Sequence, residues 1–590
     1  MTSPPAPSDA PSRDGFNALA AYRAAFANPD RPLVFSYRID PFKKLQCRTY
    51  TAGTIWELAC RGATALRAHG LKAGDRQLHA FGNNHYLDLV YRLAALLVDT
   101  VPVTVNWQAD TVERLCFKAD LAEVGLVIHQ RDFDETALAA LRQHRPELPC
   151  LDAGSVADHE PLSESAWTPA RDPDGARLVI FTSGTTGHPK GAVLTHANYR
   201  TNAATFDQFL EIPPGTGLAA LVVNPMHHAN ASAMTDWCLR RDDGEIHLIE
   251  RYTTDFWRVM ARVGLRPGRI VAPMVSRHFD FLAELDATEK LPVSATHLRA
   301  GMARIDFLLG SAPVGPTTIK RMLDYAGKPP LVRFGSTETC LQVMGIPYRL
   351  DRAQVIALFE RGWHFDNGRR VGYYIGRPHE GHTRVRVVKS LGDGNPDHWV
   401  DCKPGRPGYL VCSGGNVMAG YLAQPEATDA VLRSGWYSGF KDIGYYLIHP
   451  EDGERDFFWM SRESTMLIRG GANYAYDQIN AELEAFIGDR FGLAESEFEV
   501  AVVGKRLHSE HEDDCIATLS LHGERARSRQ REMAEALPGA MRGKVSKGAL
   551  PSLVRFGPIP RNFKGAVQVP ALMEAVEAWL EVSEGETRKG

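Results

Sequence analysis

The sequence predicts an α/β protein with a large N-terminal part and a small α+β C-terminal domain. Its 590 residues exceed one ordinary hydrophobic core, so size alone indicates about two to four domains. Between residues 175 and 345, strand-like runs alternate with helical ones, which is typical of a layered α/β sheet. The C-terminal part adds two strand-like and two helical runs, at 500–503, 515–521, 529–537 and 571–580.

Apolar spacing predicts the earlier elements in order. Residues 55–69 have the spacing of an amphipathic helix, and 87–98 form a nearly continuous apolar run that predicts a buried helix. The short apolar runs at 178–181 and 218–223 predict buried strands, and 317–325 predicts a helix.

Composition is that of an ordinary globular enzyme, with 44% hydrophobic and 23% charged residues. The formal net charge of −4 gives no reason to expect nucleic acid or an anionic membrane as a partner. No run of about 18 apolar residues is present, so we expect no membrane span.

The cysteines and the chain ends indicate a cellular location. Nine cysteines are scattered without a C-x-x-C pair, which favours free thiols in a reducing compartment, so we expect a cytoplasmic protein. Residues 1–14 are rich in Pro and Ser and lack an apolar core, which predicts a disordered tail rather than a signal peptide. A second short tail is expected at 583–590.

The most informative segment, FTSGTTGHPKG at 181–191, follows the predicted strand at 178–181. Small and hydroxylated residues can fold so that successive backbone N–H groups converge on an anion. These residues are Thr182, Ser183, Gly184, Thr185, Thr186 and Gly187. Lys190 adds a mobile positive charge for the outer phosphates, and the spacing is not that of a Walker A loop. The alternative is a flexible surface turn.

This string resembles the phosphate-binding signature of the ANL superfamily of adenylate-forming enzymes, which includes acyl- and aryl-CoA synthetases, nonribosomal peptide adenylation domains and beetle luciferases. The resemblance implies that ATP activates a carboxylic acid as an acyl-adenylate, with release of pyrophosphate and later transfer to a thiol. It also implies an N-terminal domain at 15–463 that ends in a small β-barrel at about 370–460, and a mobile C-terminal domain at 464–582.

Further motifs of the family follow in order. His228 resembles the histidine near the carboxylate pocket, although a lone histidine is also common as a core or surface group. Gly310, Ser311 and Ala312 resemble the wall beside adenine, and Phe334, Gly335, Ser336, Thr337 and Glu338 resemble the adenine-stacking motif. The resemblance implies that Thr337 hydrogen-bonds the α-phosphate and that Glu338 holds Mg²⁺.

The later motifs are present in altered form. Asp442 is the best candidate to bind the ribose hydroxyls, since a carboxylate only accepts hydrogen bonds. Arg462 matches an arginine that also contacts ribose, and Ser464 stands at a hinge position that usually holds Asp or Lys. Gly470 and Gly471 resemble the segment that lines the pantetheine tunnel in CoA-using members, which implies CoA.

The sharpest departure is at the catalytic lysine of the family, where this chain has Ala566. Residues two apart in an extended loop point to the same side, about 6–7 Å apart, so Lys564 is predicted to substitute. The alternative is that Lys564 is a solvated surface lysine and that adenylation is weak or absent.

Three functions therefore compete. The first is a ligase that makes an acyl-CoA or aryl-CoA thioester. The second is an adenylate-forming enzyme that delivers its acyl group to a carrier protein, an amine or an internal nucleophile. The third is a nucleotide- or acyl-binding protein that has lost catalysis. The candidate pocket segments at 227–234, 274–278 and 340–344 do not choose between aryl, fatty and amino acids.

Overall fold

The structure is a computed structural model. It describes residues 15–40, 42, 44–182, 189–365, 371–469, 472–507, 513–542, 544–545, 549–562 and 565–587. Several predictions fall outside these ranges: the tail at 1–14, the loop residues 183–187, Gly470, Gly471 and Lys564.

The larger sheet is parallel at its centre. Its parallel strands run in the spatial order β13, β12, β11, β9, β10 and β1, and β2 pairs antiparallel with β1 at the edge. These are β13 (Leu331–Phe334), β12 (Ile305–Leu309), β11 (Arg269–Met274), β9 (Leu218–Val222), β10 (Gly244–Ile249), β1 (Pro32–Ile39) and β2 (Leu45–Thr51). The predicted strand at 218–223 is β9.

The same sheet continues into an antiparallel region. β14 (Met344–Gly345) pairs with β13 on one side and with β15 (Tyr373–Pro378) on the other. Beyond β15 lie β22 (Arg455–Arg462), β21 (Asp442–Ile448), β17 (Gly408–Gly414), β20 (Trp436–Tyr437) and β19 (Leu432–Arg433), and β16 (Thr383–Val388) pairs with β17. The region expected as a small barrel is therefore antiparallel, and among the described residues its strand pairings are continuous with the large sheet.

The second sheet has seven strands. Its order is β18, β8, β7, β4, β3, β5 and β6, with β7 to β6 parallel and with β8 and β18 antiparallel. The strands are β18 (Gly420–Tyr421), β8 (Lys190–Thr195), β7 (Ala176–Thr182), β4 (Val101–Thr104), β3 (Arg76–Ala80), β5 (Leu126–His129) and β6 (Cys150–Asp152). The predicted buried strand at 178–181 lies in β7.

Helices fill the space between the sheets. α2 (Tyr86–Val98) is buried at every position after the first, as its apolar run predicts, because a helix that is apolar all round needs cover on all sides. One core cluster joins α2 to α1 (Ala52–Ala68), to α6 (Ala229–Leu239) and to the face of β9 that carries Ala220 and Val222. The remaining helices before residue 430 are α3 (Val112–Leu121), α4 (Glu135–His144), α5 (His196–Leu210), α7 (Phe256–Val263), α8 (Ser276–Ala287), α9 (Ala295–Met302), α10 (Pro316–Ala326), α11 (Arg352–Trp363) and α12 (Pro425–Asp429).

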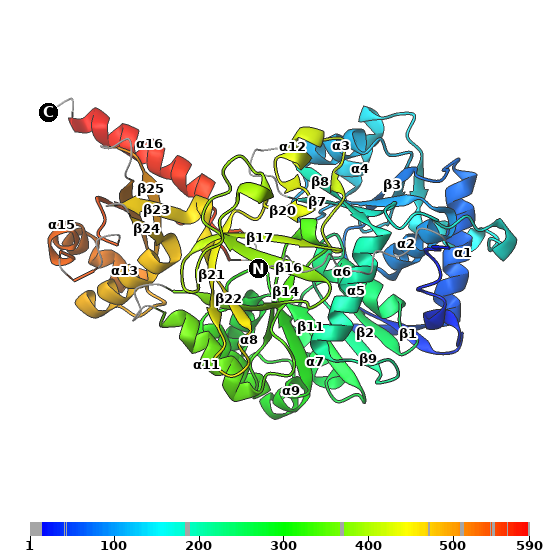
Figure 1. Ribbon diagram of the computed structural model, residues 1–590, viewed down its shortest axis with the longest axis horizontal. Coiled ribbons are helices and arrows are strands. Elements are labelled where there is room, and N and C mark those ends of the chain that lie inside the picture. Colours follow the sequence, from blue (N-terminus) through cyan, green and yellow to red (C-terminus); the bar gives the residue numbers. More distant parts are fainter. Residues whose placement is uncertain are drawn as a thin grey trace.

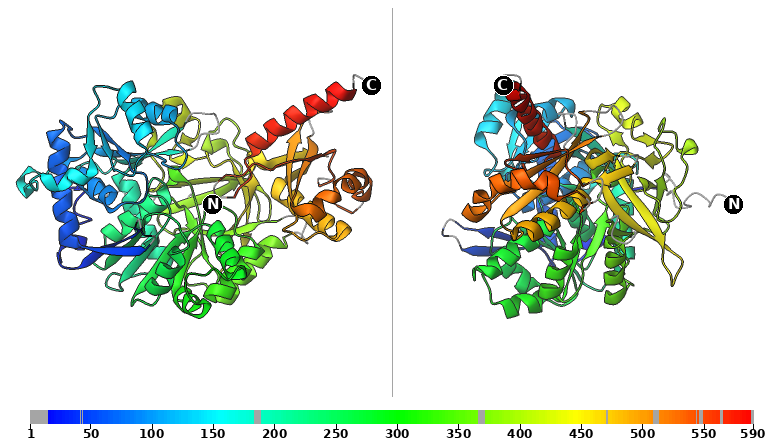
Figure 2. Two further views of the ribbon diagram at one scale, coloured as in Figure 1. Left: turned by 180° about the vertical axis from the view of Figure 1, so that it is seen from behind. Right: turned by 90° about the vertical axis from the view of Figure 1, so that its left-hand side faces the viewer.

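The C-terminal elements gather at one side of the larger body (Figures 1 and 2). They are β23 (Met466–Arg469), β24 (Ala472–Ala475), α13 (Tyr476–Phe491), β25 (Phe498–Lys505), β26 (Asp514–Leu521), α14 (Gly523–Ser528), α15 (Gln530–Ala540), β27 (Leu553–Phe556) and α16 (Val569–Thr587). Their buried side chains, from Leu467 to Val576, form a core cluster of their own. The strands and helices predicted after residue 464 are confirmed, and the domain boundaries stay a prediction. Within the described ranges, no helix has the length and apolarity needed to cross a membrane.

Candidate active site

The ends of two paired strands bracket the predicted phosphate loop. Thr182 closes β7 and Lys190 opens β8, and the two residues are partners in the antiparallel register. Thr182 Oγ1 donates a 3.4 Å hydrogen bond to the carbonyl oxygen of Lys190. The strand pairing therefore fixes both ends of the loop, whose residues 183–188 lie outside the described part of the chain.

Tyr421 connects this loop to the predicted metal-binding glutamate. Lys190 Nζ lies 5.2 Å from the centre of the Tyr421 ring. Tyr421 Oη donates a 2.8 Å hydrogen bond to Glu338 Oε1, which belongs to a residue only 9% exposed. Burial, and then the Glu338 charge, raise the pKa of the Tyr421 phenol well above its usual range. Sequence reasoning assigned Tyr421 no role.

Glu338 suits a magnesium ion that is shared with a nucleotide. Its backbone carbonyl accepts a 2.7 Å hydrogen bond from the Met418 N–H, which fixes the residue in the short helical turn Thr337–Thr339. No group of three metal-ligating His, Cys, Asp or Glu side chains occurs among the described residues. Mg²⁺ typically uses one or two carboxylates together with phosphates and water, so a single carboxylate fits that ion better than a metal held by protein alone.

The predicted adenine wall lies at the carboxyl ends of β12 and β13. The Phe334 ring centre is 5.1 Å from that of Phe440, so this ring is packed on one side. Ser311 has a φ of +69°, an uncommon conformation for a residue with a side chain. At Gly335, a Cβ atom would collide with the Leu341 carbonyl oxygen, so the turn after Phe334 requires glycine.

Asp442 and Arg462, the two predicted ribose contacts, face each other across β21 and β22. Asp442 Oδ1 is 3.4 Å from Arg462 Nε but receives no well-aligned hydrogen bond within the described part of the chain. Burial raises the pKa of the Asp442 carboxyl to about 6, and Arg462 only partly offsets this effect. A buried acceptor without a donor fits a ligand hydroxyl group.

His228 lies at the N-terminal boundary of α6, in the loop that follows β9. The ring of its neighbour His227 is buried and lies 5.8 Å from Trp107 and 4.3 Å from His228, measured between ring centres. The structure thus places His228 at the carboxyl end of the parallel sheet, the edge at which ligands bind in open α/β sheets.

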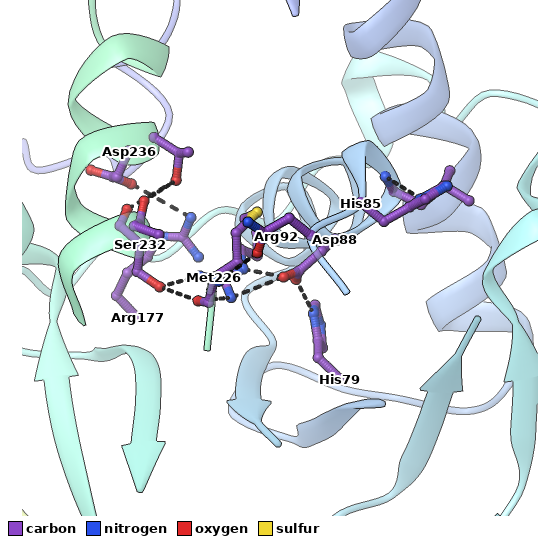
Figure 3. Close-up of polar contacts among 12 residues, drawn as sticks. His79, His85, Asp88, Arg92, Arg177, Met226, Ser232 and Asp236 are labelled. Carbon is purple, nitrogen blue, oxygen red and sulfur yellow. Dashed lines mark hydrogen bonds and ion pairs between the residues drawn. The ribbon is translucent and has the colours of Figure 1, made fainter. Parts of the chain in front are cut away.

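A buried polar network that sequence reasoning missed holds the segment before His228 (Figure 3). Arg92 donates to the Met226 carbonyl oxygen at 2.9 Å and to Ser232 Oγ at 2.7 Å. The same guanidinium makes two hydrogen bonds to Asp88, at 2.8 and 3.1 Å. The sequence signal was a charged pair four residues apart inside the apolar run at 87–98.

His79 and Asn84 extend this network. His79 Nδ1 lies 2.7 Å from Asp88 Oδ1. Burial would raise the pKa of Asp88, but Arg92 and His79 hold it below its usual range. Asn84 Oδ1 accepts from the Met226 N–H at 2.8 Å, and its amide donates to the Asn224 carbonyl oxygen at 3.0 Å. Side chains before and within α2 thus set the path of the chain into α6.

Comparison with known proteins identifies the family, because residues 22–422 match the AMP-binding enzymes. The chain belongs to the AMP-binding enzyme family. It is 30% identical over 530 residues to a feruloyl-CoA synthase of Amycolatopsis sp., covering 86% of this chain and 94% of that one. It is 26% identical to a sulfoacetate–CoA ligase of Cupriavidus necator, covering 80% and 82%.

The fold is shared with ATP-bound MatB from Rhodopseudomonas palustris, with a TM-score of 0.71, 21% identity, and coverage of 95% of this chain and 99% of that one. The predicted α/β fold of adenylate-forming enzymes is therefore confirmed. The predicted activity class, an ATP-dependent acid–thiol ligase similar to acyl-CoA synthetases, is confirmed by the family and the relatives.

The segment at the lysine position of this AMP-binding enzyme lies against the N-terminal body. Asn562 and Ala566 close a tight turn: the Asn562 N–H donates to the Ala566 carbonyl oxygen at 2.9 Å, and the Ala566 N–H donates to Asn562 Oδ1 at 3.1 Å. A Cβ atom at Gly565 would lie 3.7 Å from Arg277 Cδ, on α8. Gly565 therefore lies near Arg277 at the start of α8, which follows the carboxyl end of β11.

Proposed function

We propose that this enzyme forms an acyl-adenylate from a small carboxylic acid and Mg·ATP and then transfers the acyl group to the thiol of CoA. The observation that carries the proposal is the contact series Lys190–Tyr421–Glu338, which joins the two phosphate-facing motifs around one buried tyrosine. The fit of Asp442 to a ribose hydroxyl supports the same nucleotide.

Each predicted residue then has one task. Lys190 and the loop after Thr182 hold the pyrophosphate end of ATP, and Thr337 orients the α-phosphate. Glu338 holds Mg²⁺, which when bound neutralises phosphate charge. Catalysis of this kind is mainly positioning and electrostatic stabilisation. His228 borders the acid, and Lys564 supplies positive charge to the reacting carboxylate and α-phosphate.

The remaining predicted residues contact a nucleotide that is bound at the carboxyl ends of the parallel strands. Phe334 stacks on adenine, Gly310, Ser311 and Ala312 line its far side, and Asp442 with Arg462 holds the ribose. The segment at Gly470 and Gly471 contacts the pantetheine of CoA. A cytoplasmic location is supported by the nine cysteines, all of which are free thiols.

Pyrophosphate release with Mg·ATP across a panel of carboxylic acids, with and without CoA, tests the proposal. The variants are Lys564→Ala and, as a matched control, Lys544→Ala at an exposed lysine of the same domain. We expect acid-dependent release in the wild type, a loss of about 10²–10³-fold in Lys564→Ala, and no change in the control.

The product separates the alternatives. A thioester that forms only with CoA supports the ligase, whereas an adenylate that accumulates in the presence of CoA indicates a carrier protein or an amine as the acceptor. ATP binding without pyrophosphate release from any acid indicates a nucleotide-binding protein that has lost catalysis, and contradicts the proposal.

A further inference from the structure

Phe440 lies in the segment between β20 and β21, and its ring packs on the adenine candidate Phe334. The two ring centres are 5.1 Å apart, and the ring planes are inclined by 55°. Phe440 is only 9% exposed, whereas Phe334 is partly exposed. Phe440 therefore lies on the inner side of the Phe334 ring, and the part of Phe334 that Phe440 does not cover can contact a ligand.

Tyr437, the last residue of β20, supports Phe440 in turn. The two ring centres are 4.9 Å apart and the planes are at 89°, which is the edge-to-face geometry that aromatic pairs favour. Tyr437 is only 1% exposed and is held in register with Cys412 on β17 and Leu432 on β19. Three rings therefore lead from the partly exposed Phe334 to the fully buried Tyr437.

The backbone around Phe440 is fixed on both sides. A Cβ atom at Gly439 would lie 2.6 Å from the Tyr437 hydroxyl oxygen, so the chain passes directly against this tyrosine. Lys441 has a φ of +52°, which is uncommon for a residue with a side chain. Its carbonyl oxygen accepts a 2.8 Å hydrogen bond from the Glu463 N–H. The position of Phe440 is therefore set by its neighbours in the chain.

The same segment carries the proposed ribose contact. Asp442 is the first residue of β21, two residues after Phe440, and it is buried. Two residues span at most about 7 Å, so the ring beneath Phe334 and the ribose carboxylate have a limited separation. One short segment can therefore hold two parts of one nucleoside.

We propose that Phe440 is a positioning residue for the adenine base: it holds the Phe334 ring in the orientation that stacks on adenine, while Asp442 holds the ribose. The inference rests on the proposed function, because it assigns how the same nucleotide is held. A supporting ring suits this task, since stacking depends on the separation and the relative orientation of the two rings.

Binding of AMP, measured by isothermal titration calorimetry, tests the inference without catalysis. Wild type is compared with Phe440→Leu and with Phe440→Met, which is unbranched and gives a second variant without the ring if the first fails to fold. Phe359→Leu is the matched control. Phe359 is fully buried in α11 and contacts Tyr374 edge to face, with 5.9 Å between the ring centres.

We expect AMP to bind both Phe440 variants about 10-fold more weakly than wild type, and Phe359→Leu with unchanged affinity. In Phe334→Leu/Phe440→Leu the loss should be no larger than in Phe334→Leu alone, because Phe440 acts through the Phe334 ring. In Phe440→Leu/Asp442→Asn the two losses should multiply, because the ribose contact does not depend on that ring.

Steady-state kinetics give a second readout. In Phe440→Leu, KM for ATP should rise about 10-fold while kcat stays within about twofold, because the base is held equally in the ground state and the transition state. Unchanged AMP affinity in both Phe440 variants would overturn the inference, and so would losses that multiply in Phe334→Leu/Phe440→Leu. AMP binding decides this even where pyrophosphate release contradicts the proposed ligase. Wild type that does not bind AMP would contradict both.

Discussion

Tyr421 and Glu338 are 83 residues apart in sequence, and a 2.8 Å hydrogen bond joins them at the centre of the candidate site. The tyrosine is carried by β18 of one sheet, and the glutamate follows β13 of the other. The bond therefore also links the two sheets at the position where the phosphates of ATP are proposed to bind.

Replacement of this tyrosine should weaken catalysis more than stability. In Tyr421→Phe the ring remains and the hydrogen bond to Glu338 is lost, so we expect kcat/KM for Mg·ATP to fall by about 10- to 100-fold. Tyr409→Phe is the matched control, because Tyr409 donates a 2.8 Å hydrogen bond to Glu463 at the surface. Steady-state pyrophosphate release measures both, and equal effects would contradict a special role for Tyr421.

Asp442 should make both stability and ATP binding depend on pH. Burial raises its pKa to about 6 from an ordinary value of 3.8. The folded state then binds more protons than the unfolded state, so this carboxyl contributes stability below pH 4 that is lost as the pH rises to about 6. The difference of about two pKa units corresponds to about 3 kcal/mol.

The asparagine variant isolates this effect. Asp442→Asn should remove that part of the pH dependence of unfolding, measured by denaturant titration between pH 4 and 7. In wild type, KM for ATP should improve as the pH rises through 6, because the ionised carboxylate is the better acceptor for ribose hydroxyls. An unchanged pH profile of KM in Asp442→Asn would contradict the ribose assignment.

The Arg92 network should control the acid rather than ATP. Arg92→Met leaves Asp88 charged, buried and without its main partner, which should cost about 3–5 kcal/mol of unfolding free energy. The double variant Arg92→Met/Asp88→Asn removes that charge and should recover much of the stability. KM for the acid should stay raised in both variants, because the Met226 carbonyl before His228 has lost its hydrogen bond from Arg92, while KM for ATP should change little. Recovery of both the stability and the KM for the acid in the double variant would show that the network has only a structural role.

Gly335 should tolerate no side chain. The added methyl group of Gly335→Ala would overlap backbone atoms of Leu341 and Gln342, so the turn that carries Thr337 and Glu338 must shift. A displacement of about 1 Å at a catalytic group costs about 100-fold in rate, and we expect kcat to fall by at least that factor. Gly125→Ala serves as the control, since its Cβ position has one neighbour, at 4.0 Å. Normal kcat in Gly335→Ala would contradict the proposed role of this turn.

The sequence predicted best those elements whose local apolar pattern matches their burial in the folded chain. The apolar run at 87–98 became α2, and the run at 178–181 became the middle of β7, because continuous apolar character requires burial in any fold. The region near 370–460 was predicted only as a group of short strands in a small barrel. Whether antiparallel strands close a ring depends on pairings such as β14 with β15, between residues distant in sequence, which local patterns do not contain.

The candidate site shows the same division. Asp442 and Arg462 were named as a pair from their motifs, and the register of β21 and β22 places them opposite each other. The partners of Arg92 at Met226 and Ser232 were missed, because these contacts join residues more than 130 positions apart and local patterns do not contain them. Lys564 stays a prediction.

The continuity of the large sheet has a mechanical consequence. Hydrogen-bonded strands run without a break from β12, beside the proposed acid and adenine, to β21, which carries the proposed ribose contact. Such a frame resists shear, so the spacing between the adenine and ribose contacts is set when the chain folds rather than when the nucleotide arrives. We therefore expect ATP to bind a preformed site. We expect the conformational change between the two half-reactions to take place in the segments that follow Arg462.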